Sequence, residues 1–386
     1  MVAWITADEA QARLGVKLQT LYAYASRGLI ANRADAGDPR RSLYAAEDVM
    51  RLSLRKARGR QPAAAPSPLG WTEPAAVSTV AVATDGRLFY RGRDVAELAE
   101  SASLEEVARL VWRAEDEDPF LGIAPHPLMV SAADPKARAF ALLAHRAAAD
   151  PAALGRAGRA LRREAAEVLT DLVDAMCGQC RNGPLHDRLA RYWRVDGWKA
   201  DMIRRALVAA VDQELDPASL AVRVAASAGA PLAASALCGL STHAGPRHGG
   251  RLAQVAAFVS ETRRSLDARQ AALQRLSQGL DVPGFGHPLY PKGDPRARAI
   301  SSAMRYSDDL MDVAEAAEAV TGQPATLDFA LVAMARTLAL PADAPLVILT
   351  AARTAGWLAH ALEQGAADAQ LRPRPPRAKP DAAETA

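Results

Sequence analysis

The sequence predicts a mainly α-helical protein with a small separate domain at its N-terminus. Half of the 386 residues are hydrophobic and only 5% are aromatic, and alanine and leucine, which favour helices, dominate the composition. Apolar residues recur at helical spacing through most of the chain. One stretch, residues 77–92 (VSTVAVATDGRLFYRG), instead resembles a pair of strands with a turn at Asp85–Gly86.

Composition also limits the possible functions. The net charge of +3 is small for this length, which argues against a protein that coats nucleic acid or membrane surfaces. No apolar run is long enough to span a bilayer, and the N-terminus lacks the basic start of a signal peptide. Three cysteines, Cys177, Cys180 and Cys238, do not form a disulfide framework. We therefore expect a cytoplasmic protein.

The segment CGQC, residues 177–180, raises the question of a metal or redox site. A structural zinc normally takes four ligands, and no second pair stands near Cys177, Cys180 and His186 at suitable spacing. A redox motif needs a βαβ context, whereas this region is typical of a helix. We interpret both cysteines as ordinary helical residues and expect no bound metal.

Residues 1–60 form a unit of their own. Thr6 is a plausible cap for a first helix that Gly15 ends, and a second short helix ends at Gly28. Residues 38–52 then predict a turn, a short extended piece and a third helix. This order resembles the winged helix-turn-helix of the MerR and excisionase type, in which the second helix enters the major groove. Candidate DNA contacts are Lys17, Gln19, Thr20, Tyr24 and Arg27, with Arg40 and Arg41 on the wing.

The alternative for this unit is that it only docks onto the rest of the protein or onto a partner. Local positive charge favours DNA, because phosphate contacts dominate affinity. A Pro- and Ala-rich linker, residues 61–69, follows the unit. The C-terminal segment, residues 376–386, is a disordered tail by composition.

Three later stretches carry the chemistry. The first is GPRHGG, residues 245–250, where glycines flank His248. The second is GFGHPLYPKGDPRA, residues 284–297, which contains His287. The third is TLDFAL, residues 326–331, where Asp328 stands just inside a helix. Each stretch alone also has a purely structural interpretation. A lone Asp at the start of a helix is usually a cap, and a lone His is usually a structural residue.

Together, in this order, the three stretches resemble the citrate synthase family. Residues 88–112, 213–250 and 348–364 are similar to further segments of that family, so the resemblance covers roughly residues 69–375. It implies a helical large domain over residues 70–250, a small domain over 251–345 and a return to the large domain over 346–375. It also implies a homodimer, with coenzyme A entering as a thioester substrate and no cofactor.

The resemblance assigns roles to the three stretches in a condensation of acetyl-CoA with oxaloacetate. Asp328 matches the base that removes a proton from the acetyl methyl group. His248 matches the donor to the enolate oxygen. His287 matches the residue that polarises the ketone. His186, in the look-alike segment GPLHD, and His360, in a helix, receive no catalytic role.

Cations suit the two carboxylates of oxaloacetate and the phosphates of coenzyme A. The family positions imply substrate binding by Arg296, Arg353 and Arg372, the last from the partner subunit. Lys292 and Arg298 are candidates for the phosphates.

Several positions depart from the family pattern and put the substrate in question. Gln213 stands where a histidine is usual, and Arg251–Leu252 stands where Ala-Asn is usual. Pro291 replaces a basic residue, and Phe-Ala-Leu follows Asp328 where Phe-Tyr-Ser-Gly is usual. Two alternatives follow. The protein condenses another acyl-CoA, such as propionyl-CoA, or it is a DNA-binding regulator whose synthase-like part senses acyl-CoA or a dicarboxylate.

Overall fold

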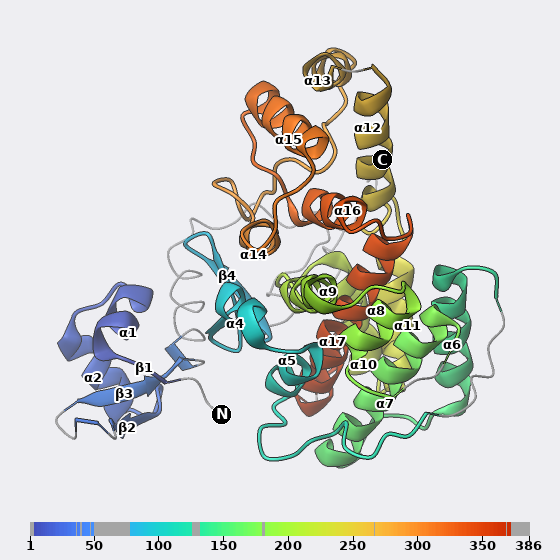
Figure 1. Cartoon of the computed structure of the whole chain (residues 1–386). Coiled ribbons are helices and arrows are strands. Elements are labelled where there is room, and N and C mark those ends of the chain that lie inside the picture. Colours follow the sequence, from blue (N-terminus) through green and yellow to red (C-terminus); the bar gives the residue numbers. More distant parts are fainter. Residues whose placement is uncertain are drawn as a thin grey trace, which may run out of the picture. The chain divides into compact units, whose positions relative to one another are not determined.

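The computed structural model describes residues 4–35, 37–38, 41–46, 48–49, 78–125, 132–179, 182–265, 267–367 and 369–371. The chain divides into two compact units (Figure 1), one over residues 80–368 and one built mainly on the N-terminal segment that ends at Thr79. Each unit is considered by itself below.

The N-terminal unit packs two helices against a three-stranded sheet. Its elements are β1 (Trp4–Ile5), α1 (Ala7–Leu14), α2 (Leu18–Ser26), β2 (Asn32–Ala34) and β3 (Ser42–Ala45), with β3 central and antiparallel to both neighbours. Thr6 and Glu9 form a capping box at α1, and Gly15 ends that helix in the left-handed region at φ 58°. The predicted cap and the two predicted helices are thus confirmed. The third predicted helix lies partly outside the described residues. Arg40 and the 61–69 linker lie wholly outside them.

The 80–368 unit begins with the predicted hairpin. Strands β4 (Ala81–Thr84) and β5 (Arg87–Tyr90) pair antiparallel with Thr84 opposite Arg87, and β6 (Arg93–Asp94) extends the sheet. Asp85 and Gly86 both have positive φ, 52° and 73°, which is the backbone of a tight two-residue turn. Tyr90 anchors the hairpin, because its buried hydroxyl donates to the Ala209 carbonyl at 3.1 Å and accepts the Asp212 N–H at 3.1 Å.

The secondary-structure elements that follow in the described part of this unit are helices, as predicted. They are α4 (Val95–Ser101), α5 (Leu104–Val111), α6 (Pro135–Ala149), α7 (Gly158–Cys177), α8 (Leu185–Tyr192), α9 (Gly197–Ala209), α10 (Pro217–Ser227), α11 (Leu232–His243), α12 (Arg251–Ser265), α13 (Ala268–Ser277), α14 (Pro295–Ser301), α15 (Asp308–Thr321), α16 (Leu327–Thr337) and α17 (Ala344–Ala366).

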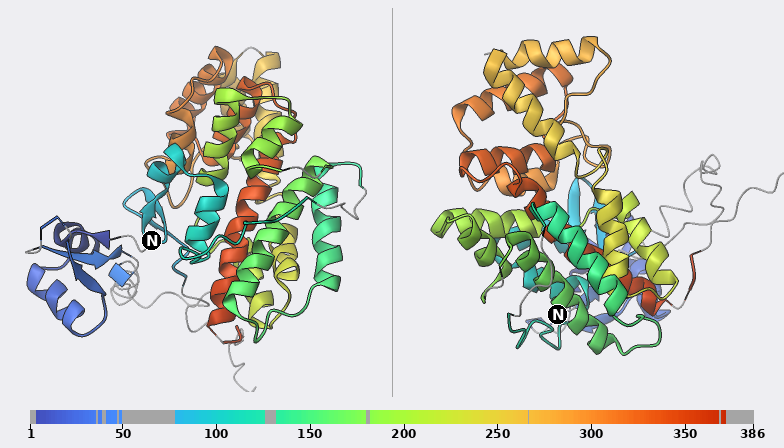
Figure 2. Two further views of the ribbon diagram at one scale, coloured as in Figure 1. Left: turned by 60° about the horizontal axis from the view of Figure 1, so that its bottom comes forward. Right: turned by 90° about the vertical axis from the view of Figure 1, so that its right-hand side faces the viewer.

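Helix α17 is the centre of the larger helical lobe. It packs against α5, α7, α9, α10 and α11, and Figure 2 shows it in red, passing between its neighbours. The helices α12, α13, α15 and α16 gather at the opposite end of the unit, away from α6 and α7, in both figures. Helix α14, which also lies within residues 251–345, contacts α4 and α9 as well as α16. The domain boundaries at 250 and 345 remain predictions.

The interpretation of residues 177–180 as helix needs a correction. Helix α7 ends at Cys177 because Gly178 takes a left-handed conformation at φ 67°. Cys180 lies outside the described residues. No group of three His, Cys, Asp or Glu side chains within the described ranges is arranged to hold a metal ion. Of the helices that the structure describes, none combines the length and apolarity that crossing a membrane requires.

Gly356 permits a close approach of α17 to the backbone of a neighbouring segment. A Cβ at this position would lie 2.2 Å from the backbone carbonyl oxygen of Val211, whereas a Cβ at Gly365 on the same helix meets nothing within 4 Å. The backbone at Val211 leads directly to Asp212 and Gln213, so the contact at Gly356 fixes part of the pocket described next.

We expect Gly356→Ala to lower the free energy of unfolding by about 1–3 kcal/mol or more, because the methyl group overpacks a site with no room. Gly365→Ala is the matched control and should be neutral or stabilising by up to about 1 kcal/mol, the gain in helix propensity. Chemical denaturation of both variants checks this. Equal effects of the two substitutions would contradict the proposed steric origin.

Candidate active site

A polar pocket of about 240 Å³ lies where the 245–250 turn and the 284–294 loop meet the starts of α14 and α16 and the middle of α17. Six of the residues predicted for the site line it, although they come from distant parts of the chain: Gln213, His248, His287, Arg296, Asp328 and Arg353.

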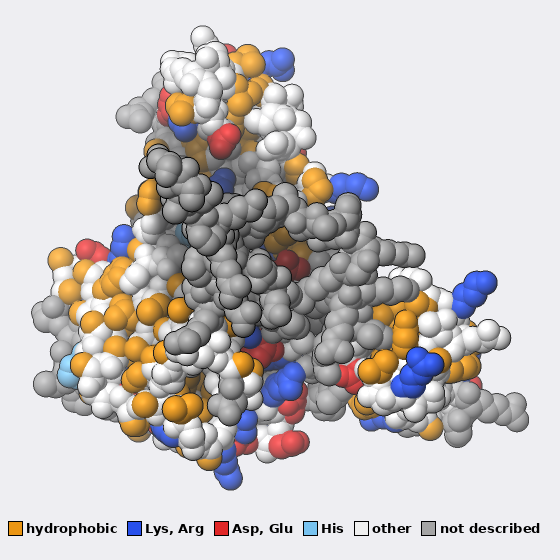
Figure 3. Space-filling model, turned by 180° about the vertical axis from the view of Figure 1, so that it is seen from behind, with side chains coloured by type: hydrophobic (Ala, Val, Ile, Leu, Met, Phe, Trp, Pro, Cys, Tyr) orange, Lys and Arg blue, Asp and Glu red, His pale blue; other side chains and the backbone are white. Residues whose placement is uncertain are grey.

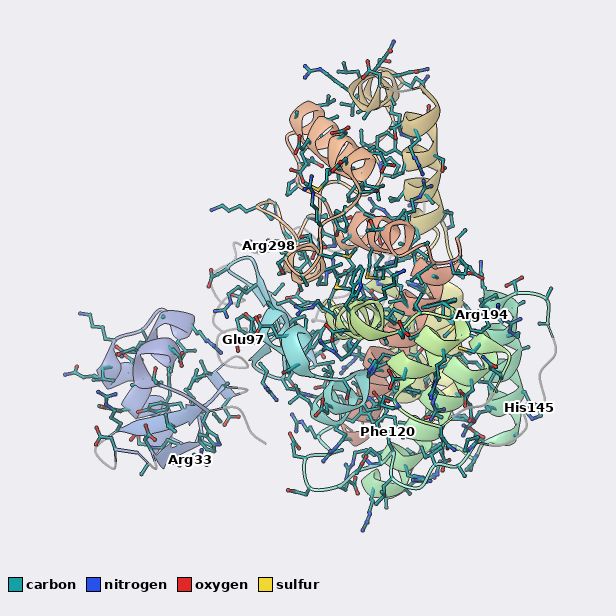
Figure 4. The ribbon with its side chains drawn as sticks, in the orientation of Figure 1. Arg33, Glu97, Phe120, His145, Arg194 and Arg298 are labelled. Atoms are coloured by element: carbon teal, nitrogen blue, oxygen red, sulfur yellow. The ribbon has the colours of Figure 1, made fainter. Side chains whose placement is uncertain are left out.

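Two predicted cations do not line the pocket. Lys292 is exposed. Arg298 donates to the carbonyl of Gly86 at 3.2 Å, and Figure 4 shows it at α14, on the side of the β4–β5 hairpin. Their assignment to coenzyme A phosphates remains untested, and Arg372 lies outside the described residues.

The glycine-rich turn explains how His248 reaches the pocket. Helix α11 ends at His243, whose carbonyl accepts the Gly249 N–H at 2.8 Å. A Cβ at Gly250 would lie 2.7 Å from the Cα atom of Pro246, so this tight turn needs glycine there. The chain then re-enters a helix at Arg251. The motif GPRHGG therefore presents His248 between two helix ends.

His287 is held as a neutral hydrogen-bond donor. Gly286 donates to the Pro324 carbonyl at 2.9 Å, which ties the loop to the segment before α16. The Leu289 N–H donates to Nδ1 of His287 at 3.2 Å, so a neutral ring carries its proton on Nε2. Burial, reinforced by the nearby Arg296, lowers the pKa of His287 to about 4.

Asp328 is the second residue of α16 and is partly buried. Burial raises the pKa of its carboxyl, while the Arg251 and Arg296 guanidinium groups act in the opposite direction. Arg251 faces it with 3.9 Å between Nε and Oδ2. The usual capping interpretation does not account for Asp328, because the N-cap of α16 is Thr326 and the Leu327 N–H is taken by Asp294 at 3.0 Å.

Arg296 is fully buried and tightly held. Asp294 accepts from its Nε at 2.9 Å and from its Nη2 at 2.8 Å, while Gln213 Oε1 accepts from Nη1. Burial alone would raise the pKa of Asp294, but the charge of Arg296 outweighs it and the pKa is lowered. Because the Gln213 oxygen is engaged by Arg296, its NH2 group is left as the donor for a ligand.

Arg353 projects from α17 between two carboxylates. It lies 3.5 Å from Asp212 and 3.8 Å from Asp216. Asp212 also lies 2.9 Å from Nε2 of His360, which is completely buried. His360 does not line the pocket, in agreement with the packing role predicted for it, and neither does His186, which stands in the first turn of α8.

Four charged or titratable residues that line the pocket were not among the predicted site residues: Asp216, His243, Arg247 and Arg251. Of these, Arg251 was noted only as a departure from the family pattern. Burial, then Arg353, lowers the pKa of His243 to about 3, so this ring too stays neutral. The sequence did hold a signal for two of them. His243 and Arg251 flank the glycine turn at the end of one helix and the start of the next, so the turn that presents His248 also brings them to the pocket.

The structure is that of a helical protein with a pocket that brings together two aspartates, three histidines and four arginines, and the arginines suit an anionic ligand. Residues 131–374 match the family model described as "Citrate synthase, C-terminal domain". The chain belongs to the citrate synthase family.

Curated relatives agree with this family. The chain is 32% identical over 178 residues to "Putative citrate synthase 2" of Mycobacterium tuberculosis, a match that covers 43% of this chain and 48% of that protein. It is 25% identical over 355 residues to "2-methylcitrate synthase" of Shewanella oneidensis, covering 77% of this chain and 90% of that protein. The chain thus spans about half the length of the first curated relatives that it matches.

Solved structures show the same fold. Citrate synthase from Thermotoga maritima superposes with a TM-score of 0.65 at 19% identity, covering 81% of this chain and 96% of that one. Citrate synthase from Thermoplasma acidophilum, in a ternary complex with carboxymethyl coenzyme A and oxaloacetate, superposes with a TM-score of 0.66 at 17% identity, covering 80% and 95%.

We expect Asp294→Asn to lower the free energy of unfolding by about 3–5 kcal/mol, because it leaves the buried Arg296 charge without its partner. Asp308→Asn is the control: Asp308 pairs with Arg305 at the surface, with side chains 85% and 80% exposed, and such pairs contribute at most about 1 kcal/mol. Denaturant unfolding measures both.

The Asp294 effect should also depend on pH. Because the pKa of Asp294 is lowered in the folded protein, its contribution is present above the unfolded-state pKa and is lost as the pH falls through the folded-state pKa. The stability gap between wild type and Asp294→Asn should therefore narrow in acid. A gap that widens in acid would contradict the assignment.

Proposed function

We propose that this protein is an acyltransferase that condenses acetyl-CoA with oxaloacetate to give citrate and coenzyme A. The observation that carries the proposal is that Asp328, His248 and His287 line one pocket together with Arg296 and Arg353. Family membership supplies the same expectation independently. No cofactor is needed, because coenzyme A takes part as the substrate thioester.

Condensation begins with removal of a proton from the acetyl methyl group. Asp328 acts as the base, and its raised pKa makes it a stronger base than an exposed carboxylate. Negative charge then develops on the thioester oxygen. A hydrogen bond from His248 stabilises this enolate.

The enolate carbon attacks the ketone of oxaloacetate. His287 donates from Nε2 to the ketone oxygen, which increases the positive character of the carbonyl carbon. Its lowered pKa keeps the ring neutral, and a neutral imidazole serves such enolisations. Arg296 and Arg353 bind the carboxylates together with the Gln213 amide, and the partner subunit's Arg372 completes the set. Water then hydrolyses the citryl thioester.

A homodimer follows from this role for Arg372. Apolar side chains on the surface support it: Figure 3 shows many on the helical lobe of the 80–368 unit. Val224 on α10 is 41% exposed. Contiguous exposed apolar surface is typical of interfaces.

We propose further that the N-terminal unit is a winged helix-turn-helix that binds DNA, in a cytoplasmic protein. The β2–β3 hairpin supplies the wing, on which Arg41 has a side chain 77% exposed. Lys17, Gln19 and Arg27 are exposed at α2, whereas Thr20 and Tyr24 are partly buried. The exposed Tyr22, at 52%, favours the docking alternative instead.

A second candidate function is a DNA-binding regulator that senses a dicarboxylate or acyl-CoA without turnover. The observation that favours it is the approach of Arg251 to the base Asp328, which weakens the base in the free protein. Thiol release from acetyl-CoA and oxaloacetate separates the two functions directly, and propionyl-CoA in the same assay tests the alternative acyl donor.

Asp328→Asn should abolish thiol release while the fold survives, because the amide keeps the shape but cannot accept the methyl proton. The loss in kcat should reach or exceed the ~10²–10⁴-fold usual for a general base. Asp308→Asn serves as the control and should retain activity. Near-normal turnover in Asp328→Asn would remove the assignment.

A chain that starts near residue 66 should keep thiol release and lose DNA binding. The full-length chain should bind duplex DNA with an affinity that falls steeply with salt, as gel retardation at several salt concentrations would show. A folded but inactive truncation would make the N-terminal unit part of the enzyme. Absence of DNA retention at low salt would favour docking.

A further inference from the structure

Arg251 lines the pocket with three other arginines, and it differs from the two buried ones, Arg296 and Arg353, in how closely carboxylates hold its guanidinium. Arg296 is held by Asp294 at 2.8 Å, with both side chains at most 2% exposed. Arg353 stands between two carboxylates and is 5% exposed. Arg251 instead has a side chain 39% exposed and faces Asp328 at 3.9 Å, which is a long and loosely held ion pair.

The position of Arg251 fixes what it can reach. It is the first residue of α12, and its N–H donates to the His248 carbonyl at 2.8 Å. The side chain lines the pocket together with His287 and Asp328. A guanidinium there can bind the base or a ligand carboxylate, and an exposed side chain can move between them at low cost.

Several charged groups lie around Asp328, and they determine how much its basicity changes when Arg251 binds a ligand carboxylate instead. Arg251 faces it from α12, Asp294 and Arg296 from the start of α14, and Arg353 from α17. Asp294 already offsets Arg296. Arg251 is therefore the cation whose removal from Asp328 would change the basicity of that carboxylate most.

We propose that Arg251 exchanges Asp328 for a carboxylate of the incoming 2-oxo acid, and so releases the base only after that substrate is bound. The ligand class is a dicarboxylic 2-oxo acid, and the inference rests on the proposed function in naming Asp328 as the base. In the free protein Arg251 stabilises the ionised carboxylate and weakens it as a base. In the complex Arg251 neutralises substrate charge instead.

Oxaloacetate binding, measured by titration calorimetry without acetyl-CoA, tests the exchange. Arg251→Gln should weaken binding by about tenfold or more, since a charge-assisted hydrogen bond to the ligand is lost. Asp328→Asn should strengthen binding several-fold, because the competing carboxylate is gone. This gain should disappear in the double variant, which isolates the coupling between the two residues.

Proton uptake supplies a second measurement. When Arg251 leaves Asp328 the pKa of that carboxyl rises, so oxaloacetate binding should take up protons at mildly acidic pH. Calorimetry in two buffers with different ionisation heats measures this uptake. The proton uptake on oxaloacetate binding should be smaller in Arg251→Gln than in the wild type. Arg305→Gln is the matched control, because Arg305 also pairs with an aspartate but at the surface, and it should leave affinity and uptake unchanged.

The outcomes are separable from those of the proposed function. Unchanged oxaloacetate affinity in Arg251→Gln, or a gain in Asp328→Asn that persists in the double variant, would overturn the exchange even if the wild type releases thiol. Conversely, the wild type could release no thiol and still show the predicted proton uptake and the predicted coupling between Arg251 and Asp328 in oxaloacetate binding. That result would support the exchange and contradict the proposed condensation.

Discussion

The buried carboxylate of Asp294 organises the whole site. One of its oxygens accepts the Arg296 backbone N–H and Nε, and the other accepts Nη2 and the Leu327 N–H. A single side chain thus starts α14, orients the arginine and fixes the first residue of α16. Through Arg296 the same network reaches Gln213 in the larger helical lobe. The loop with His287 and the helix with Asp328 are consequently placed relative to each other by one group.

Electrostatics then divides the work among similar residues. The imidazole rings of His243 and His287 are largely buried, and arginines lie close to them. Burial and the positive charge of the arginines both lower the pKa of each ring, so both rings stay neutral. The same burial has the opposite consequence for Asp328, whose charged form is disfavoured and whose basicity rises. One environment therefore yields uncharged donors from histidines and a stronger base from an aspartate, which is the combination that enolate chemistry needs.

Local patterns in the sequence predicted local structure well. The Asp85–Gly86 turn, the Thr6 cap and the helices are confirmed, because each depends on a few neighbouring residues. The helical interpretation of residues 177–180 was wrong because periodicity does not reveal a glycine in the left-handed region. The approach of Arg251 to Asp328 could not be predicted, since it depends on how α12 and α16 pack. The motif resemblance predicted six residues that line one pocket. It did not indicate which of their charges are balanced by a neighbouring residue of opposite charge.

The hydrogen bond from Leu289 to His287 has a chemical consequence beyond proton donation. An imidazole with a pKa near 4 stays uncharged in mildly acidic solution, where exposed histidines of ordinary pKa are mostly protonated. The Leu289 N–H occupies the lone pair of Nδ1, and Nε2 carries the ring proton, so neither nitrogen of His287 offers a free lone pair. Although its ring is uncharged, His287 should therefore react slowly with acylating reagents, which need an unoccupied imidazole lone pair.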